Sequence, residues 1–295
     1  MSDLRLSPRV LGASAGPCHQ VIDARWLMAY AGALGETDAR YFDTETSSGP
    51  AAHPLFSVCY EWPLAVELRE RAIGEAIAPF GVHATHDVVI HRPPRAGDRL
   101  STSACIVEVR PVKAGSLVVG RYDSVDAAGK PVTTTHYGSI YRGVVGLGGP
   151  CGSPQTPPVA FRPGCAGAVL EFSANIPPAW QAQVPISAQL AHVYTECARI
   201  WNPIHTDIAL ARAAGLPGLI LHGTATLALA VSQVVARELN GDPGLVRRVA
   251  ARFTGMVPMP SVVTVRGYES PSEEFHFDVV DAAGRPVLGR GVVKA

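Results

Sequence analysis

Three residues in the last third of the chain can move a proton and stabilise a negative charge. His205 follows Asn202 by three positions, in the run Trp201-Asn202-Pro203-Ile204-His205. Imidazole titrates near neutrality, so this histidine can act as a general base. The asparagine amide can hold a water, a hydroxyl or the imidazole itself. Gly223 stands at the expected start of a long helix, where a backbone N–H can closely approach a developing oxyanion. The pattern predicts acid–base chemistry.

The segments around these residues alternate between helical and strand patterns. Helical spacing over Ser187–Ile200 predicts a helix with Ser187 as its N-cap, and Pro203 is expected to end it. A short helix is expected over 208–214, and a long apolar helix over 223–239. Four β-rich segments follow the long helix, at Val249–Thr254, Ser261–Tyr268, Glu274–Val280 and Val287–Val293.

The first half of the chain repeats this plan. Its long helix is expected over Phe56–Ile73, and its strands near His86–Arg92, Ser101–Arg110, Leu117–Asp123 and Pro131–Tyr141. The sequences DSVDAAGKPV, from Asp123, and DVVDAAGRPV, from Asp278, differ only at their second and eighth positions. Each predicts a hairpin with glycine in its turn. Similar segments recurring in the same order support a tandem duplication.

Two further matches align the halves residue by residue. The segment from Glu36 to Asp43 matches Ile200 to Asp207, so that Glu36 corresponds to Ile200 and Tyr41 to His205. His53 corresponds in the same way to His222. Only the second half therefore carries the histidine. We expect the first half to be a structural partner that shapes the ligand tunnel.

A long helix followed by antiparallel strands predicts an α+β fold in which a sheet wraps one central helix, the hot-dog arrangement. Two copies in one chain would then mimic a hot-dog dimer, with ligand sites where the copies meet. A segment rich in glycine and proline, residues 146–164, predicts a linker. We place the boundary near residue 155, which gives an N-terminal unit over about 1–150 and a C-terminal unit over about 151–295.

Composition excludes several classes of protein. The chain has 25 basic and 25 acidic residues and is 47% hydrophobic, which fits a globular protein and argues against nucleic acid or an anionic membrane as its main partner. No leader or membrane span is expected, and six scattered cysteines without CxxC spacing indicate reduced thiols in the cytoplasm. A metal site at His83, His86 and His91 is not expected, because residues three apart on a strand point to opposite faces.

The run from Trp201 to Asp207, with Ala-Ala-Gly at 213–215 and Leu-His-Gly at 221–223, resembles the hydratase motif of MaoC-like proteins. These include (R)-specific enoyl-CoA hydratases and 3-hydroxyacyl-thioester dehydratases. The resemblance covers most of the chain and implies a double hot-dog hydro-lyase that adds water to 2-enoyl thioesters or removes it from 3-hydroxyacyl thioesters. It implies a CoA or acyl-carrier thioester as substrate and no further cofactor. His205 would be the base, Asn202 would position water, and the Gly223 N–H would stabilise the enolate.

The sequence departs from this motif at one position. MaoC-like proteins carry an aspartate two residues before the asparagine, and here that residue is Ile200. Glu196, one helical turn earlier, and Glu36, its counterpart in the first half, are the candidate replacements. Without an acid, the chain could instead bind an acyl thioester or another metabolite, or catalyse an isomerisation or a cyclisation.

Other residues are assigned supporting roles. Ile200, Trp201 and His222 are expected around the pocket, although Trp201 and Tyr194 also fit core positions. Arg92 and Arg95 carry positive charge that could approach the phosphates of the carrier. The chain could act as a monomeric pseudo-dimer or form a homodimer.

Overall fold

The computed structural model describes residues 4–146, 177–270 and 273–295. The helices and strands of its first part are β1 (Ser14–Val21), α1 (Ala24–Ala33), α2 (Ser57–Ala72), β2 (Gly81–Ile90), β3 (Arg99–Val112), β4 (Gly115–Val125) and β5 (Pro131–Arg142). Those of its second part are β6 (Trp180–Ile186), α3 (Leu190–Ala198), α4 (Ile208–Ala213), α5 (Gly223–Glu238), β7 (Arg248–Phe253), β8 (Ser261–Tyr268), β9 (Glu274–Asp281) and β10 (Pro286–Lys294). Short 3₁₀ turns are η1 (Pro8–Val10), η2 (Ala39–Tyr41), η3 (Ala78–Phe80), η4 (Pro203–His205) and η5 (Pro243–Leu245).

The strands form one antiparallel sheet of ten, in the order β1-β3-β4-β5-β2-β7-β10-β9-β8-β6. The order of the first five strands is repeated in reverse by the last five, with β1 matching β6 and β2 matching β7. Each half contributes five strands, and the halves join where β2 pairs with β7. This symmetry confirms the double hot-dog architecture expected from the duplication.

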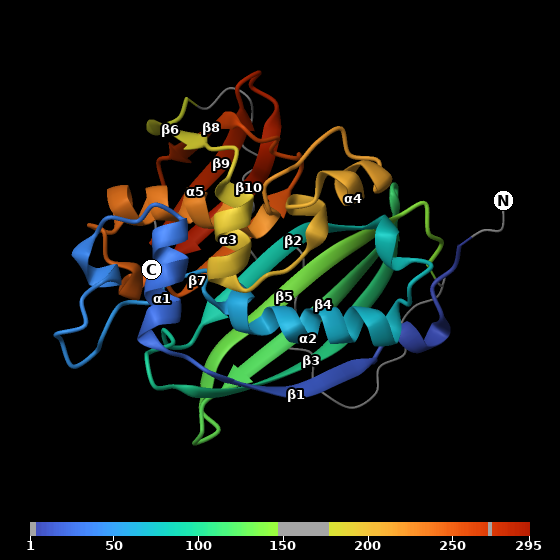
Figure 1. The fold of residues 1–295 in the computed structure, drawn as a ribbon, viewed down its shortest axis with the longest axis horizontal. Coiled ribbons are helices and arrows are strands. Elements are labelled where there is room, and N and C mark those ends of the chain that lie inside the picture. Colours follow the sequence, from blue (N-terminus) through green and yellow to red (C-terminus); the bar gives the residue numbers. More distant parts are fainter. Residues whose placement is uncertain (1–3, 147–176, 271–272) are drawn as a thin grey trace.

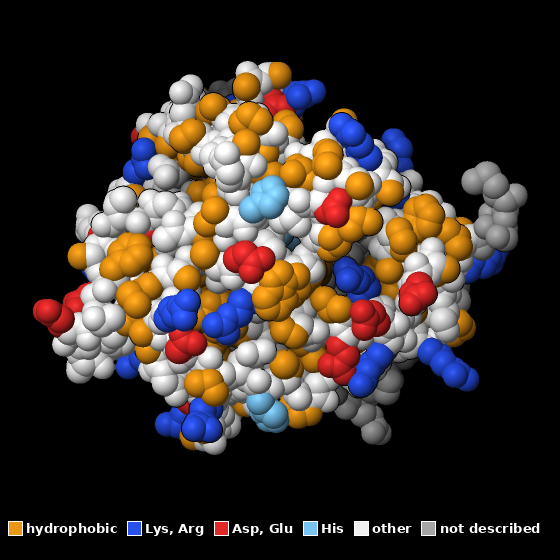
Figure 2. Space-filling model, in the orientation of Figure 1, with side chains coloured by type: hydrophobic (Ala, Val, Ile, Leu, Met, Phe, Trp, Pro, Cys, Tyr) orange, Lys and Arg blue, Asp and Glu red, His pale blue; other side chains and the backbone are white. Residues whose placement is uncertain are grey.

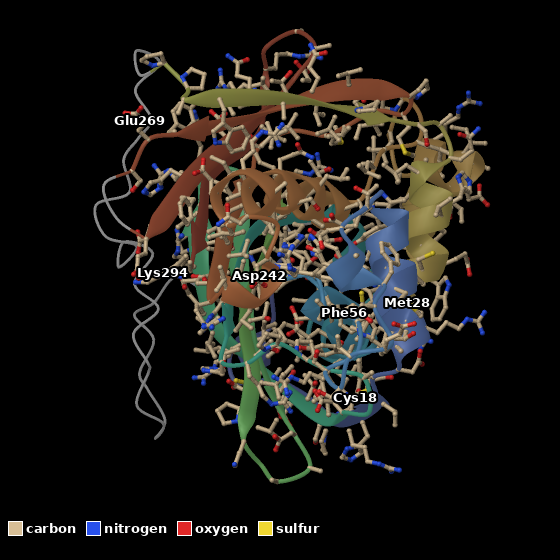
Figure 3. All side chains as sticks on the ribbon, turned by 90° about the vertical axis from the view of Figure 1, so that its left-hand side faces the viewer. Cys18, Met28, Phe56, Asp242, Glu269 and Lys294 are labelled. Atoms are coloured by element: carbon tan, nitrogen blue, oxygen red, sulfur yellow. The ribbon has the colours of Figure 1, made fainter. Side chains whose placement is uncertain are left out.

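Helices cover the concave side of this sheet (Figure 1). The long helix α2 lies along the strands of the first half and contacts β1 and β3, whereas α5 contacts β7, β8, β9 and β10. Ten side chains of α5 are buried, which explains its almost wholly apolar sequence. From the side, α5 runs between the strands of the second half and the pair α1 and α3 (Figure 3).

The halves also meet through α1 and α3, which pack against each other. Tyr30 of α1 and Tyr194 of α3 are both fully buried, with their hydroxyl oxygens 3.4 Å apart. They are 164 residues apart in the chain, the same offset that relates Tyr41 to His205. The two tyrosines are therefore equivalent residues of the two copies, meeting at their common axis.

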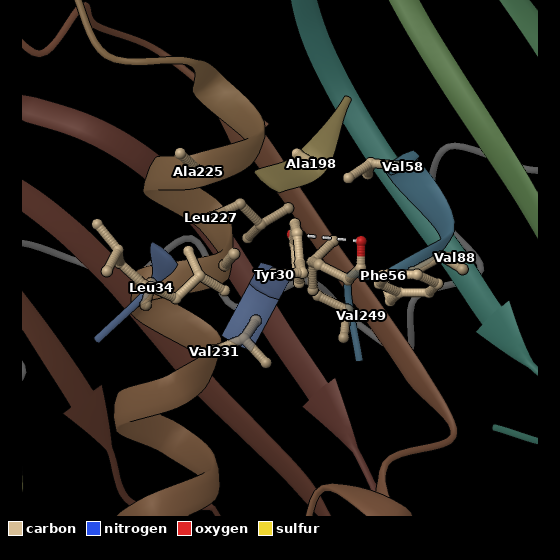
Figure 4. Packing of buried hydrophobic residues seen from close by; sticks show 14 of the residues in the cluster. Tyr30, Leu34, Phe56, Val58, Val88, Ala198, Ala225, Leu227, Val231 and Val249 are labelled. Atoms are coloured by element: carbon tan, nitrogen blue, oxygen red, sulfur yellow. Dashed lines mark hydrogen bonds between the residues drawn. The ribbon is translucent and has the colours of Figure 1, made fainter. Parts of the chain in front are cut away.

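A salt bridge and a shared core strengthen the junction. Arg248 on β7 makes bonds of 2.8 and 2.6 Å with the two carboxylate oxygens of Asp87 on β2. Buried apolar residues from both halves form one cluster, and Figure 4 shows Tyr30 and Phe56 beside Leu227 and Val249. A continuous core means that neither half exposes its inner face to water.

The predicted long helices and all eight predicted strands are present within a few residues of their expected ends. Two local predictions were wrong. Ser187 does not cap α3, which starts three residues later without a side-chain cap. Pro203 does not end that helix either, because Arg199 terminates it in the left-handed conformation (φ 58°) and Pro203 begins η4. Helix α1 and the edge strands β1 and β6 were not anticipated. The predicted boundary at 155, and nearly all of the predicted linker, lie outside the described residues.

Candidate active site

His205 ends the turn η4 and is fixed by one backbone group. Its side chain is 9% exposed, and its Nδ1–H donates a hydrogen bond of 2.9 Å to the carbonyl of Ile220. Ile220 is itself held by a bridge to Pro258. Since Nδ1 carries the proton, Nε2 carries the free lone pair. Burial lowers the pKa of His205 to about 4, with the carbonyl of Ile220 opposing that shift, so the ring is neutral at pH 7 and Nε2 can accept a proton.

His222 lies directly against His205, with ring centroids 3.8 Å apart. Its Nε2 is 3.2 Å from the hydroxyl of Thr195, a buried residue of α3. Burial lowers the pKa of His222 to about 2, and the neighbouring His205 adds to the effect. Because the two rings are in contact, protonation of one imidazole would lower the pKa of the other.

Gly223 is the first residue of α5, directly after His222. The N–H groups of a first helical turn have no partner within the helix and carry partial positive charge. A Cβ added to Gly223 would lie 3.1 Å from the ring of Phe253, so only glycine leaves this corner open. His222 therefore links the two candidate groups, since its ring contacts that of His205 and Gly223 follows it in the chain.

Asn202 and Trp201 occupy the loop before His205. Asn202 precedes η4, but its side chain does not cap the turn, which leaves the amide available to a ligand. Trp201 is 59% exposed, which corrects the expectation that it fits a core position. The left-handed residue Arg199 turns the chain, burying Ile200 and directing Trp201 outward. Tyr194, in contrast, is fully buried as expected.

The structure does not bring either candidate acid to His205. Ile200 is 3% exposed and belongs to the apolar core. Glu196 lies on the exposed side of α3. Among the described residues, no carboxylate contributes to the pKa of His205. The acid of the motif is therefore replaced by a core residue.

Glu36 instead belongs to the equivalent site of the first half. It accepts a hydrogen bond from Ser232 of α5, and its carboxylate is 3.8 Å from Nε2 of His53. His53 accepts a bond from the N–H of Leu55 at Nδ1, so its Nε2–H faces Ser232 at 3.2 Å. The ring of Tyr41 lies near that of His53, with centroids 6.2 Å apart, in the place that corresponds to the closer pair of His205 and His222 at 3.8 Å. Burial raises the pKa of Glu36 and lowers that of His53 to about 3.

The two arginines assigned to phosphate binding differ in their availability. Arg92 donates to both carboxylate oxygens of Asp98, at 2.7 and 3.1 Å, and to Asp126 at 3.2 Å. These bonds occupy its guanidinium group. Arg95 is exposed, and within the described ranges its guanidinium has no recorded partner. Of the two, Arg95 is the one that could meet a phosphate.

A pair of histidines on β2 was misjudged from sequence. A register shift between His83 and Thr85 brings His83 and His86 to the same side of the strand, with ring centroids 5.5 Å apart. His91 lies elsewhere, exposed and bonded to Thr134. The argument that spacing separates His83 from His86 was wrong, because a bulge inserts a residue into the alternation. Among the described residues no group of three potential ligands has the geometry of a metal site.

The surface and the cysteines add little chemistry. On the face shown in Figure 2, acidic and basic side chains are interspersed with apolar ones, without a patch of one sign. The four cysteines in the described segments are free thiols, and burial raises the pKa of Cys59.

Of the helices described, none is long and apolar enough to cross a membrane.

Comparison with known proteins identifies both halves. The MaoC like domain model matches residues 173–283, and the FAS1-like dehydratase domain region model matches residues 9–135. The chain is 28% identical to 3-hydroxyacyl-thioester dehydratase Y of Mycobacterium tuberculosis, over 99% of both chains. It is 41% identical to fatty acid synthase subunit beta of Aspergillus oryzae over 76 residues, but this match spans only 4% of that protein.

Solved structures agree on the fold. A MaoC-like dehydratase from Phytophthora capsici superposes with a TM-score of 0.80 at 20% identity, covering 97% of this chain and 95% of the other. A Mycobacterium tuberculosis protein described as a double hotdog fold superposes with a TM-score of 0.57 at 15% identity, covering 96% and 94%. With both halves matched by dehydratase models and one relative aligned end to end, the chain belongs to the MaoC-like and FAS1-like dehydratase family of double hot-dog proteins.

Proposed function

We propose that this chain is a hydro-lyase that interconverts 2-enoyl thioesters and 3-hydroxyacyl thioesters, using His205 as its base. The observation that carries the proposal is the bond from Nδ1–H of His205 to the carbonyl of Ile220. It leaves Nε2 as a neutral base close to the N-terminus of α5. The relative that matches the whole chain is a 3-hydroxyacyl-thioester dehydratase, which supports the same reaction.

The residues present support a one-base mechanism. Asn202 holds a water, and Nε2 of His205 takes a proton from it as its oxygen bonds to the β-carbon. The electrons of the double bond move toward the thioester oxygen, where the N–H of Gly223 stabilises the enolate. The resulting imidazolium then delivers its proton to the α-carbon on the same face. Dehydration is the reverse sequence. No carboxylate is needed, because one nitrogen handles both proton transfers.

The acyl chain would extend from this site into the first half. Phe253 adjoins Gly223 and packs on His83 (centroids 4.2 Å apart), which stacks on Tyr137 (3.8 Å). Tyr137 lines a solvent-open groove between α2 and strands β3 to β5. The groove is lined largely by apolar and aromatic side chains, including Trp62 and Leu68. Such a lining suits a hydrocarbon chain.

The direct test follows the absorbance of the conjugated thioester with crotonyl-CoA and longer 2-enoyl-CoAs. We expect turnover, and a loss of about 10²- to 10⁴-fold in kcat for His205→Gln. His19→Gln, at an exposed position on β1, is the matched control and should leave kcat unchanged. Failure of the folded wild-type protein to turn over any chain length would refute the proposal.

A second reaction is favoured by the burial of Ile200 where the family carries an acid. With one base and no acid, the site could move a proton between carbons and shift the double bond without adding water. Analysis of the products by NMR in heavy water separates the two reactions. A 3-hydroxyacyl product supports hydration, whereas deuterium incorporation with a displaced double bond supports isomerisation.

We also propose that residues 1–150 and 151–295 are the two units of the duplication, and that the chain is monomeric. The pairing of Tyr30 with Tyr194 already supplies, within one chain, the contact between equivalent helices. Sedimentation analysis should give one species of 31.1 kDa, and a stable dimer would contradict this.

A further inference from the structure

The groove between α2 and strands β3 to β5 has one cation in its wall (Figure 1). Arg69 of α2 lines the groove, half-buried, with its guanidinium carbon 6.0 Å from the ring centroid of Trp62. Among the described residues, Arg69 has neither an ion pair nor a hydrogen-bond partner. Arg71 of the same helix, in contrast, pairs with Glu67 at 2.7 Å. The guanidinium of Arg69 is therefore available to an anion.

Three tyrosines of the sheet line the same groove. Tyr122 and Tyr141 are each 4% exposed, and Tyr137 is half-buried. None of the three hydroxyl groups has a hydrogen-bond partner in the described segments, and none is sealed off from the groove. Burial raises the pKa of all three phenols, and the positive charge of Arg69 opposes that rise in each. The guanidinium and the phenols therefore surround one space.

A glycine hollows the floor of this space. Gly120 on β4 pairs with Tyr137 on β5, so the floor lacks a side chain at this point. A Cβ added to Gly120 would lie 3.2 Å from the ring of Tyr122 and 3.3 Å from its hydroxyl oxygen. The groove encloses about 60 Å³. A water molecule needs about 10–15 Å³ and a benzene ring occupies a cavity of about 150 Å³, so the groove fits a terminal group of a few atoms.

The polar groups around this space are donors. A guanidinium has five N–H donors and no acceptor, and each phenol can donate one hydrogen bond. A carboxylate satisfies them best, because it is small, planar and negatively charged, and can accept two bonds from one guanidinium. Apolar side chains complete the lining and suit an aliphatic stem behind the carboxylate; they are Leu68, Ile73, Ile106 and Val118.

The protein does not supply this carboxylate itself. Glu61 of α2 is close enough to Tyr122 to affect its pKa, but it is 5% exposed and accepts a hydrogen bond of 2.7 Å from Thr135. Burial raises the pKa of Glu61 to about 8, so this carboxyl is mostly protonated at pH 7. The charge of Arg69 is therefore not neutralised by Glu61.

We propose that this groove binds a carboxylate at the end of an aliphatic segment, with Arg69 as its counter-ion and the hydroxyls of Tyr122 and Tyr141 as donors. Two kinds of molecule can supply it: an acyl thioester whose chain ends in a carboxylate, or a free aliphatic acid. The first source rests on the proposed function, because it requires the acyl chain to run from the thioester into the groove. The carboxylate would then mark the end of the substrate that is far from the reacting carbons.

Binding without chemistry tests the site. Titration calorimetry at pH 7 would compare saturated acyl-CoAs with the mono-CoA thioesters of dicarboxylic acids of equal length, from about six to twelve carbons. Saturated thioesters cannot be hydrated. Decanoate and decanol form the second pair. We expect the carboxylate-ended member to bind about tenfold more tightly than its neutral counterpart. A preference among the thioesters identifies the acyl chain as the source, whereas a preference for decanoate alone identifies a free acid.

Substitutions separate charge recognition from packing. Arg69→Met should remove the preference and keep the affinity for the neutral ligands, whereas Arg69→Lys should retain part of the preference because it keeps the charge. Arg71→Met, exposed on the same helix, is the control and should change neither. A preference that survives in Arg69→Met would overturn the assignment. Equal losses for charged and neutral ligands would also overturn it, since Arg69 would then act only by packing on Trp62.

The phenols give a second, independent variant. Tyr122→Phe/Tyr141→Phe removes two hydroxyls without partners, so Tm should stay unchanged while the preference falls about three- to tenfold. An unchanged preference would show that these hydroxyls do not contact the carboxylate.

The outcomes also separate this inference from the proposed function. If charged and neutral ligands bind equally in both series, the groove is not a carboxylate site, and turnover of crotonyl-CoA leaves the hydro-lyase standing. If the preference is found but no enoyl-CoA is turned over, the carboxylate site stands and the proposed function fails.

Discussion

The most diagnostic consequence of the site is its pH dependence. Burial places the pKa of His205 at about 4 in place of the ordinary 6.5. At pH 5 a base with a pKa of about 4 is about 90% neutral, whereas one with a pKa of 6.5 is about 3% neutral. The fraction of enzyme with a neutral His205 at pH 5 therefore differs about 30-fold between the two pKa values. We therefore expect kcat/KM to stay near its maximum down to pH 5 and to fall only around pH 4.

The assay is the initial rate of enoyl-CoA hydration at subsaturating substrate, at constant ionic strength, from pH 4 to pH 8. This condition reports the pKa values of the free enzyme. An acid limb centred between pH 6 and 7 would refute the reasoning, because it would mean that His205 is solvated or paired with a carboxylate. The result would also restore a conventional acid to the site.

Acid unfolding must be separated from titration of the base. His53, His86, His205 and His222 are all neutral when folded, with lowered pKa values, but they accept protons in the unfolded chain. Their contribution to stability is therefore intact above pH 6.5 and declines as the pH falls toward their folded values. Enzyme incubated at each low pH and then assayed at pH 7 should recover its full rate. Lost activity that does not return belongs to unfolding.

Two other changes should have separable effects. In Gly223→Ala the new methyl group would press on the ring of Phe253, so we expect kcat/KM to fall about 10- to 100-fold. The control is Gly218→Ala, which has open space around it and should leave kcat/KM unchanged. Equal kcat/KM for the two variants would contradict a role of Gly223 in the reaction. Burial raises the pKa of Glu61 to about 8, so the folded state favours its protonated form and loses stability as the pH rises from 5 to 8. Urea unfolding should show that the free energy of unfolding falls by up to about 3 kcal/mol less between pH 5 and pH 8 in Glu61→Gln than in the wild-type protein. Parallel plots of this free energy against pH for the two proteins would disprove the raised pKa of Glu61.

Periodicity and repetition in the sequence predicted most of the fold, because the responsible signals are local. The apolar run of α5 and the hairpins ending at Gly129 and Gly284 can be recognised from a few neighbouring residues. The edge strand β1 was missed for a related reason. It contains Gly16 and Pro17, and only one of its residues is buried, so it lacks the alternation that marks a half-buried strand.

The site was predictable only in part, because its chemistry depends on contacts between distant segments. The type and spacing of His205 predict that it is a base, but its tautomer is set by the carbonyl of Ile220, 15 residues away. The shared face of His83 and His86 results from a bulge, which leaves no mark in the sequence pattern. The partner of Glu36 lies 196 residues along the chain.

That last contact explains how the duplicated halves have diverged. Glu36 stands where the family places its acid, but in the half whose base position is Tyr41. It binds Ser232 on α5, the helix whose first residue is Gly223. The carboxylate is thus committed to anchoring the helix of the other half. Removing this carboxylate would lower the stability of the fold, because it would leave Ser232 and His53 partly unpaired within the shared core. We infer that the first half retained its acid for packing, while the second retained its base for chemistry.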